Sequence, residues 1–257
     1  MEENGPFELL SVVHLIRPIG EQAHDLESLR AGIARADAAT LFLHTIQCPL
    51  RLPDSDEPPP DDFSTWVSGV VQDRETAERL SFAVQSRGGS PSELRSGLLE
   101  VLESVPEKDR LARVAPAEAD FEFLTTESVP VPTGCVAREA HELLEGLEAA
   151  DLSAWFYHLT EQPWYEGTSP AITRWIAEHG EPRLAEILED EARSGRGLEE
   201  IRRRVLRRWR QSRLRARVTA AADYTEHERQ DAARAAVAGL VRRMTRVEET
   251  DDTRSGS

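Results

Sequence analysis

The sequence predicts a mostly helical protein with a minor β component (α+β), built from two pseudo-symmetric helical modules. A long internal repeat and helical periodicity of apolar residues over most of each copy both point to this fold class. A third observation is that each copy opens with alternating bulky residues, a pattern that favours one strand. The chain of 257 residues is long enough for two ordinary domains.

The repeat is found by shifting the chain by 114 residues, which places residues 7–49 on residues 121–163 without a gap. Of the 43 pairs, 13 are identical, among them Phe42/Phe156 and His44/His158. Further on the offset falls, and Trp66 meets Trp175. The predicted organisation is therefore module 1 (6–106), a linker (107–119), module 2 (120–218), a C-terminal helix (223–247) and a disordered tail (248–257).

The elements are expected in the same order in both modules. Strands are predicted at 7–16 and 121–131, and the Pro-x-Gly segments at Pro18 and Pro132 are expected to end them and to start a helix that contains Ala23. Acidic caps are expected to begin the later helices at Asp37, Asp151 and Asp61. Later helices are predicted near 74–86, 91–104, 181–193 and 198–218. A lone strand would leave backbone groups unpaired, so we expect the two strands to pair across a pseudo-two-fold axis.

The charge is strongly acidic and unevenly distributed. The net charge is −16, and 30 of the 31 basic residues are arginine, Lys108 being the exception. Residues 1–197 carry a net charge of −21 and residues 198–257 a net charge of +5. Such an excess is typical of proteins that work at high salt, although a GC-rich genome that favours Arg and Glu codons would also enrich these residues.

Several classes of protein are disfavoured by what the sequence lacks. There is no signal-peptide pattern and no apolar run of the roughly 20 residues that span a bilayer, so we expect a cytoplasmic protein without membrane contact. Cys48 and Cys135 have no C-x-x-C spacing, and the common phosphate, nucleotide, hydrolase and zinc motifs are absent. We therefore expect no metal and no cofactor.

The repeated residues resemble a known family, the bacterial and archaeal domain of unknown function 5752, over about residues 6–210. The resemblance rests on an aromatic strand start, a Gly-x-x-Ala segment, a Leu-x-x-Leu helix, an aromatic-His helix, a Phe-x-x-Trp segment and a late Leu-Arg helix. In the first copy these are Phe7, Gly20 and Ala23, Leu26 and Leu29, Phe42 and His44, Phe63 and Trp66, and Leu94 and Arg95. The second copy departs from the pattern, since Ile172 replaces the Phe before Trp175. The resemblance implies no activity.

The weak catalytic candidates are His44, His158 and Glu161. A histidine and a carboxylate three residues apart lie on one helix face and could pass protons or bind metal. Only the second copy has the carboxylate, because Gln47 stands at that position in the first copy. A structural, hydrogen-bonded histidine is the simpler interpretation.

Two further groups of residues are candidates for binding. Trp164 and Tyr165 follow Pro163 and, if exposed, would form a stacking platform for a sugar or a peptide. Nine arginines lie between 202 and 217 without an intervening acid, and Arg203, Arg207 and Arg210 represent the surface that they would form. This surface could contact an acidic protein, phosphates or nucleic acid, or pair with the acidic body of its own chain.

The leading hypothesis is a non-enzymatic binding or accessory protein that contacts another protein through the Arg-rich helix and the aromatic surface. One alternative is an enzyme acting on a sugar or a phosphorylated metabolite near His158 and Glu161. Another is nucleic-acid binding through residues 202–217, which the acidic body of the chain disfavours. Whether the protein is an enzyme stays open.

Overall fold

The computed structural model describes residues 5–51, 60–87, 89–194 and 196–222. The chain divides into two compact units, Met1–Leu206 and Arg207–Ser257, and each is described by itself. The helix expected at 223–247 and the tail expected at 248–257 lie outside the described residues.

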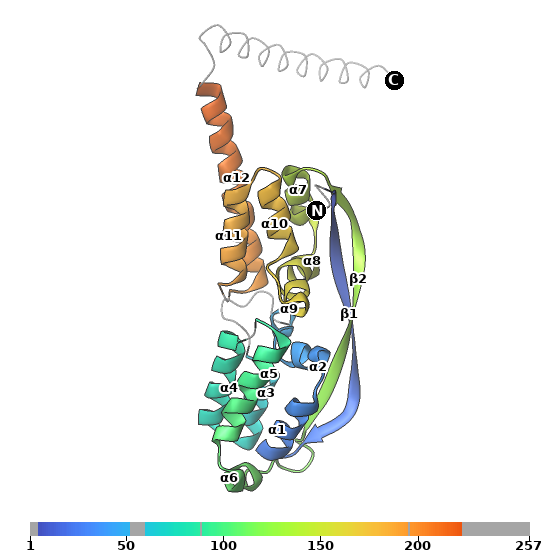
Figure 1. Ribbon diagram of the computed structural model, residues 1–257, viewed down its shortest axis with the longest axis vertical. Helices are drawn as coiled ribbons and strands as arrows, with labels where there is room; N and C mark the ends of the chain where they lie inside the picture. Colours follow the sequence, from blue (N-terminus) through green and yellow to red (C-terminus); the bar gives the residue numbers. More distant parts are fainter. Residues whose placement is uncertain (1–4, 52–59, 88, 195, 223–257) are drawn as a thin grey trace, which may run out of the picture. The chain divides into compact units, whose positions relative to one another are not determined.

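The first unit holds two halves with the same order of elements (Figure 1). The first half consists of β1 (Phe7–Ala23), α1 (Leu26–Arg35), α2 (Ala38–His44), the short 3-10 helix η1 (Cys48–Leu50), α3 (Asp62–Trp66), the π-helical turn η2 (Val67–Val71), α4 (Arg74–Arg87) and α5 (Pro91–Ser104). After the connecting helix α6 (Glu107–Ala112), the second half consists of β2 (Phe121–Ala137), α7 (Ala140–Ala149), α8 (Leu152–Phe156), the π-helical turn η3 (Tyr157–Glu161), α9 (Gln162–Glu166), α10 (Ala171–Glu178), α11 (Pro182–Ala192) and the start of α12 (Leu198–Ala222). The residues of α12 from Arg207 onward belong to the second unit. The mostly helical class with one strand opening each half is confirmed.

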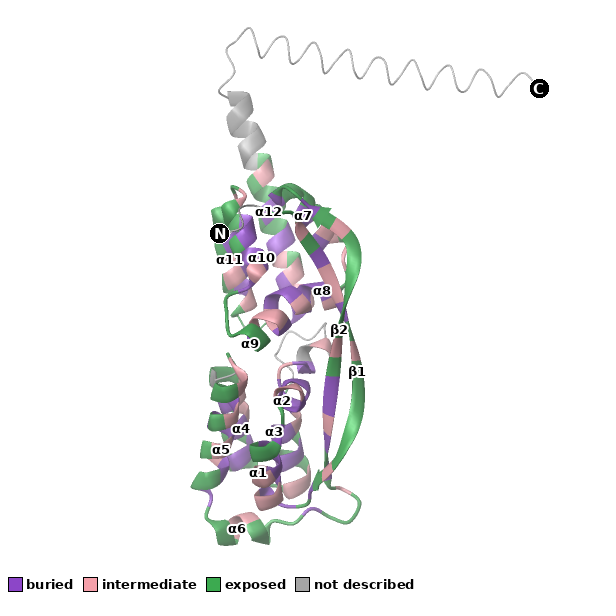
Figure 2. Cartoon of the chain, turned by 45° about the vertical axis from the view of Figure 1, so that its right-hand side comes forward, coloured by how far each residue is buried: buried purple, intermediate pink, exposed green. Residues whose placement is uncertain are grey.

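The expected pairing of the two strands is also confirmed, because β1 and β2 form an antiparallel two-stranded sheet. His14 lies opposite Ser128, which is its counterpart at the 114-residue offset. A residue pairs with its own counterpart only where a two-fold axis crosses the sheet, so the pseudo-two-fold axis passes between these two residues. The helices of both halves lie on one face of this sheet (Figures 1 and 2).

Each strand begins against the helices of the other half. The indole Nε1 of Trp66 donates to the backbone oxygen of Ala119 at 2.8 Å, and Nε1 of the counterpart Trp175 donates to that of Gly5 at 3.0 Å. The Phe121 ring, at the start of β2, lies 5.2 Å from the ring of Phe63 on α3. The strands therefore join the two halves, because each half buries apolar side chains that the other supplies.

The expectation that the Pro-x-Gly segments end the strands is wrong. β1 continues to Ala23, so this residue lies in the strand and not in the following helix. Pro18 lies opposite Leu124, whose N–H donates to His44, so this pair does not exchange ladder hydrogen bonds and proline removes none. Gly20 then adopts a φ of +76°, and the register shifts beyond Pro18, so the segment is an irregularity within a long strand.

The predicted acidic caps begin the helices as expected. The side chains of Asp37, Asp61 and Asp151 accept hydrogen bonds from the backbone N–H groups three residues on, which satisfies donors that a helix start leaves free. Residues 107–119, expected to be a linker, contain α6 and hold the N–H of Ala115 against the carbonyl of His24 at 2.6 Å. This connection is therefore packed against the first half.

Candidate functional site

Buried polar side chains cluster around the centre of the sheet. His14 Nε2 lies 2.9 Å from Oε2 of Glu161, and the two side chains are only 9% and 2% exposed. At the offset of 114 residues their counterparts are Ser128 and Gln47, which also carry buried polar atoms. The aromatic pair Phe42 and Phe156 adjoins this cluster, with both ring centroids 6.3 Å from that of His14.

The candidates His44 and His158 each bind a backbone N–H of the opposite strand. His44 Nε2 accepts from Leu124 at 3.0 Å and His158 Nε2 accepts from Leu10 at 2.9 Å. Because Nε2 must be unprotonated to accept, both rings are held as the Nδ1–H tautomer. These bonds account for both histidines without a reaction, as the simpler interpretation predicts.

The second ring nitrogen meets different surroundings in the two halves. His44 Nδ1 lies 2.8 Å from Oδ2 of Asp62. Burial raises the pKa of that carboxyl, but its hydrogen bonds to His44 and Arg51 outweigh burial and leave the pKa below its ordinary value. In the second half, burial lowers the pKa of His158 from 6.5 to about 4, which keeps the ring neutral near neutral pH.

Glu161 does not form the predicted pair with His158. The π-helical turn η3, in which the N–H of Gln162 donates to the carbonyl of Tyr157, turns Glu161 toward His14 on β1. His14 was not a candidate from the sequence alone, because it is 147 residues away from Glu161. A polar residue on the inward side of a strand, next to buried Val12, was the signal that could have identified it.

The predicted aromatic platform is wrong for Trp164. Its side chain is buried, at 3% exposure, with its ring 5.2 Å from that of Phe42. Tyr165 is 41% exposed and also contacts Phe42, and burial together with the charge of Glu161 raises the pKa of its hydroxyl. A large apolar ring packs into the core where the opposite half offers it another aromatic surface.

The arginine run is divided between the two units. In the first unit Arg203 pairs with Glu199 at 3.3 Å, and Arg204 donates from Nε to both carboxylate oxygens of the buried Glu191 at 2.9 and 3.0 Å. The start of the run thus neutralises carboxylates of its own chain. In the second unit Arg207 and Arg210 are exposed.

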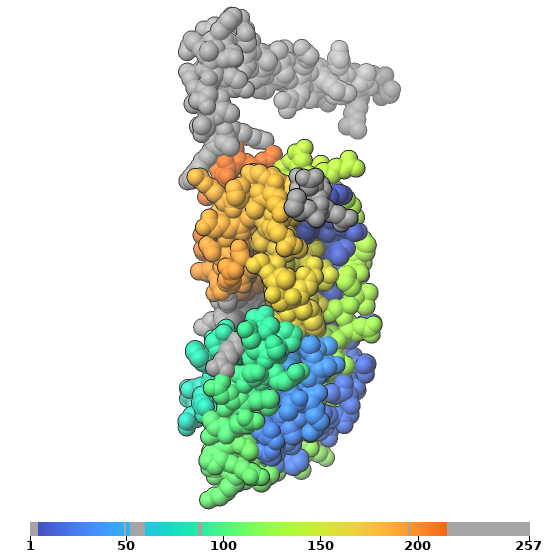
Figure 3. Space-filling view, in the orientation of Figure 1, coloured from blue at the N-terminus to red at the C-terminus, as the bar shows by residue number. Residues whose placement is uncertain are grey.

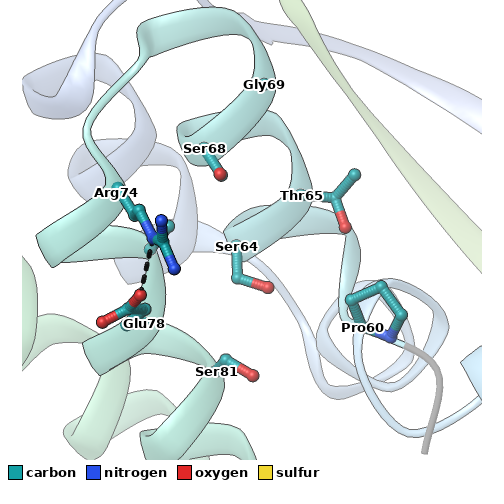
Figure 4. A pocket seen from close by; sticks show the side chains of 9 residues that line it. Pro60, Ser64, Thr65, Ser68, Gly69, Arg74, Glu78 and Ser81 are labelled. Carbon is teal, nitrogen blue, oxygen red and sulfur yellow. Dashed lines mark hydrogen bonds and ion pairs between the residues drawn. The ribbon is translucent and has the colours of Figure 1, made fainter. Parts of the chain in front are cut away.

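A hydroxyl-lined hollow of about 470 Å³ lies beside α3, η2 and α4 (Figure 4). Arg74 and Glu78 form an ion pair at its edge, with Nε 2.8 Å from Oε1. The Ser64 hydroxyl is already bonded to Asp61 as part of the helix cap. Among the described residues, no group of three or more His, Cys, Asp or Glu side chains could hold a metal ion. The lining of this hollow thus provides hydroxyl groups. None of the candidate catalytic residues, His44, His158 and Glu161, belongs to it.

The outer face of the sheet carries a group of apolar side chains, where a solvated face would be largely polar. Val13 pairs with Val129, and neighbouring Leu15 and Val131 lie on the same side, because side chains alternate along a strand and buried Val12 faces the core. These four side chains, the apolar outer face, are between 40% and 55% exposed. The sequence signal is the nearly unbroken apolar run around Val12 and Val13, a pattern typical of strands that are covered on both faces.

The fold and these contacts define a mostly helical protein whose two halves are joined by one antiparallel ribbon. The chain belongs to DUF5752, a family of unknown function, whose model matches residues 4–210. The resemblance seen in the sequence is thereby confirmed.

The chain is similar in fold to a solved structure described as the structure of OrfY from Thermoproteus tenax. The TM-score is 0.67 at 22% sequence identity, and the match covers 80% of this chain and 96% of that chain. At this identity the likeness concerns the fold alone. Among curated proteins, none matches the chain. Within the described residues, no helix is both long and apolar enough to cross a membrane.

Proposed function

We propose that this protein is a non-enzymatic accessory protein that binds another protein, and that the apolar outer face of the sheet is its main contact surface. The observation that carries the proposal is the group of four adjacent, uncovered apolar side chains: Val13, Leu15, Val129 and Val131. Contiguous exposed apolar surface on a folded protein is typical of sites where a partner binds. The polar residues Ser11 and Glu127 border the group as the cross-strand partners of Val131 and Leu15, as on the polar margin of a binding surface.

The Arg-rich helix supplies a second, charged contact in this proposal. Arg207 and Arg210 are exposed, and the exposed Leu214 adds an apolar side chain near them in the sequence. Arginine forms bidentate hydrogen bonds with carboxylates, so an acidic surface of a partner protein fits this segment. The proposal keeps the cytoplasmic, salt-rich setting expected from the composition, in which such charges contribute specificity more than affinity.

The alternative functions have less support. For an enzyme, His158 and Glu161 would have to act on one substrate, but they turn to different partners, Leu10 and His14. For nucleic-acid binding, the chain would have to attract phosphates, but residues 1–197 carry a net charge of −21, which repels them.

The proposal is tested by affinity capture of the tagged protein from its native lysate at host salt, followed by mass spectrometry. Wild type and a Val13→Ser/Val129→Ser variant are compared, with Leu111→Ser, an exposed apolar position outside the sheet, as the control. A protein captured in stoichiometric amount by wild type and the control, and lost with the double variant, supports the proposal. Equal capture by all three proteins, or no stoichiometric protein at all, contradicts it.

The contribution of the arginines is measured in the same experiment with a triple variant, Arg203→Gln/Arg207→Gln/Arg210→Gln. We expect weaker capture that depends on salt concentration, because charged contacts are screened by salt. Recovery of nucleic acid with wild type, lost with this variant and at raised salt, would favour the nucleic-acid alternative instead.

A further inference from the structure

A groove of about 500 Å³ lies between α4 and α5, two helices whose surfaces adjoin in the first half (Figure 3). Its apolar lining includes Phe82, a large aromatic side chain that is 71% exposed. Leaving so much of a phenylalanine in water is unfavourable, because burial of apolar surface is favourable. The remaining apolar lining is formed by small or short side chains: Ala83, Gly97 and Val101.

The rim of this groove is acidic. Glu75, Glu78 and Glu100 border it, whereas Arg79 is the basic residue of the lining. Arg79 donates to the hydroxyl of Ser104 at 2.7 Å. Glu78 pairs with Arg74, but both side chains are more than 60% exposed, so water and salt screen this pair. The groove therefore presents an apolar floor between carboxylates.

The counterpart helices in the second half have a different surface. Helices α11 and α12 carry the residues that correspond to α4 and α5, since Ala77–Leu80 matches Ala185–Leu188 and Glu93–Arg95 matches Glu200–Arg202. In this alignment Asp190 stands in place of Phe82 and Arg183 in place of Glu75. Glu191 and Arg204 replace Ala83 and Gly97 and form an ion pair in which Glu191 is buried and Arg204 is partly exposed.

The second half therefore folds into the same order of helices without the exposed aromatic residue and with a basic residue on the rim. The order of helices therefore does not require either feature. The apolar floor and the acidic rim are specific to the first half. This is expected of a binding surface, whereas features that the fold requires would be present in both halves.

We propose that the groove between α4 and α5 binds an amphipathic helix of a partner protein, with its apolar stripe on Phe82 and basic side chains facing the rim. This proposal rests on the proposed protein-binding function and adds a third surface to it. Helices with apolar residues at spacings of three and four commonly bind in grooves of this kind. The acidic rim selects a basic helix, because like charges brought together at an interface are repelled.

The test uses a synthetic amphipathic helical peptide of Leu and Arg, about 18 residues or five turns long, and a matched peptide of Leu and Glu. Binding to the full-length protein is measured by fluorescence anisotropy, and the bound region is located by hydrogen–deuterium exchange. We expect saturable binding of the Leu/Arg peptide only, with slower exchange in residues 75–86 and 97–101.

Two variants introduce into the groove the residue types that the second half has at the corresponding positions. Phe82→Asp removes the apolar contact and should weaken binding of the Leu/Arg peptide by about tenfold or more. A purely electrostatic attraction would instead strengthen this binding, because the variant adds a negative charge. Glu75→Arg reverses one rim charge and also weakens binding. Its control is Glu186→Arg, which makes the same charge change at an exposed position of α11 and should leave the affinity within about twofold.

Phe82 and Glu75 are both exposed, so the variants should keep the thermal stability of wild type, which is checked by a melting curve. The proposal that the groove binds a helix would be overturned by any of three results: no saturable binding of the Leu/Arg peptide, unchanged affinity with Phe82→Asp, or exchange protection elsewhere. The Val13→Ser/Val129→Ser variant should bind the peptide normally. Failure of the groove and failure of the outer face are therefore observed separately.

Discussion

His44 on α2 accepts a hydrogen bond of 3.0 Å from the backbone N–H of Leu124 on β2. The counterpart bond, from Leu10 to His158, joins β1 to the second half. Both bonds connect a helical segment of one half to the strand of the other. The backbone N–H near the start of each strand therefore has its hydrogen-bond acceptor in the other half. The two halves are therefore expected to fold and unfold together.

His44→Ala and His158→Ala should each lower the free energy of unfolding by about 3 kcal/mol, because a buried donor loses its acceptor and a cavity remains. His141→Ala, at an exposed position, is the control and should change it by less than about 0.5 kcal/mol. Unfolding is followed in denaturant by circular dichroism. Near-native stability of both histidine variants would contradict the assigned structural role.

The depressed pKa of His158 predicts that stability depends on pH. Burial places this pKa at about 4 in the folded protein, against 6.5 for an ordinary histidine. The unfolded chain binds the additional proton between these values, so stability is fully present above about pH 6.5 and decreases as the pH falls toward 4. The total contribution is on the order of 3 kcal/mol.

The measurement is the free energy of unfolding as a function of pH for wild type and for His158→Gln, which does not titrate. Above pH 6.5 the curves should run parallel, and below it the wild-type curve should fall more steeply. Parallel curves over the entire range would mean that His158 titrates normally in the folded state.

The buried pair of His14 and Glu161 predicts strong coupling in a double-mutant cycle. The counterparts Ser128 and Gln47 provide natural replacements. His14→Ser and Glu161→Gln should each destabilise by about 3 kcal/mol, because each leaves a buried polar partner unpaired. The double variant should cost at least 1 to 2 kcal/mol less than the sum of the single changes, roughly the range of couplings between contacting residues. Additive costs would show that the pair does not interact.

Gly32 and its counterpart Gly146 predict different tolerance of a methyl group. A Cβ at Gly32 would overlap the buried ring of Phe123, whereas one at Gly146 would overlap the sulfur of Cys135, a small side chain. Gly32→Ala should destabilise by about 2 kcal/mol, despite the better helix propensity of alanine. Gly146→Ala should be more stable in combination with Cys135→Ala than by itself, because the second change removes the overlapping sulfur. Equal tolerance at both positions in thermal melts would contradict the close approach of Gly32 and Phe123.

The local features of the fold could be predicted from the sequence because their signals are short-range. Asp37 and Asp151 were predicted as caps from their position before apolar helical stretches, and the strands were predicted from alternation. Pro18 and Gly20 misled the prediction because their usual effect, breaking an element, is removed when the proline lies at a pair that exchanges no ladder bonds.

The candidate site could not be predicted in the same way, since its contacts connect distant parts of the chain. Spacing placed Glu161 beside His158, but the π-helical turn directs it to His14 on the other half's strand. Trp164 was a candidate for a stacking platform on the condition that it is exposed, yet it packs on Phe42, 122 residues earlier in the sequence. Such contacts join one half of the chain to the other, which no local pattern reports.

Hydrogen–deuterium exchange of the protein alone and bound to its captured partner tests the protein-binding function most directly. The apolar outer face predicts slower exchange in the sheet at residues 11–17 and 127–131 when the partner is bound. Unchanged exchange in these residues, with protection only in other parts of the chain, would show that the partner does not bind the outer face of the sheet.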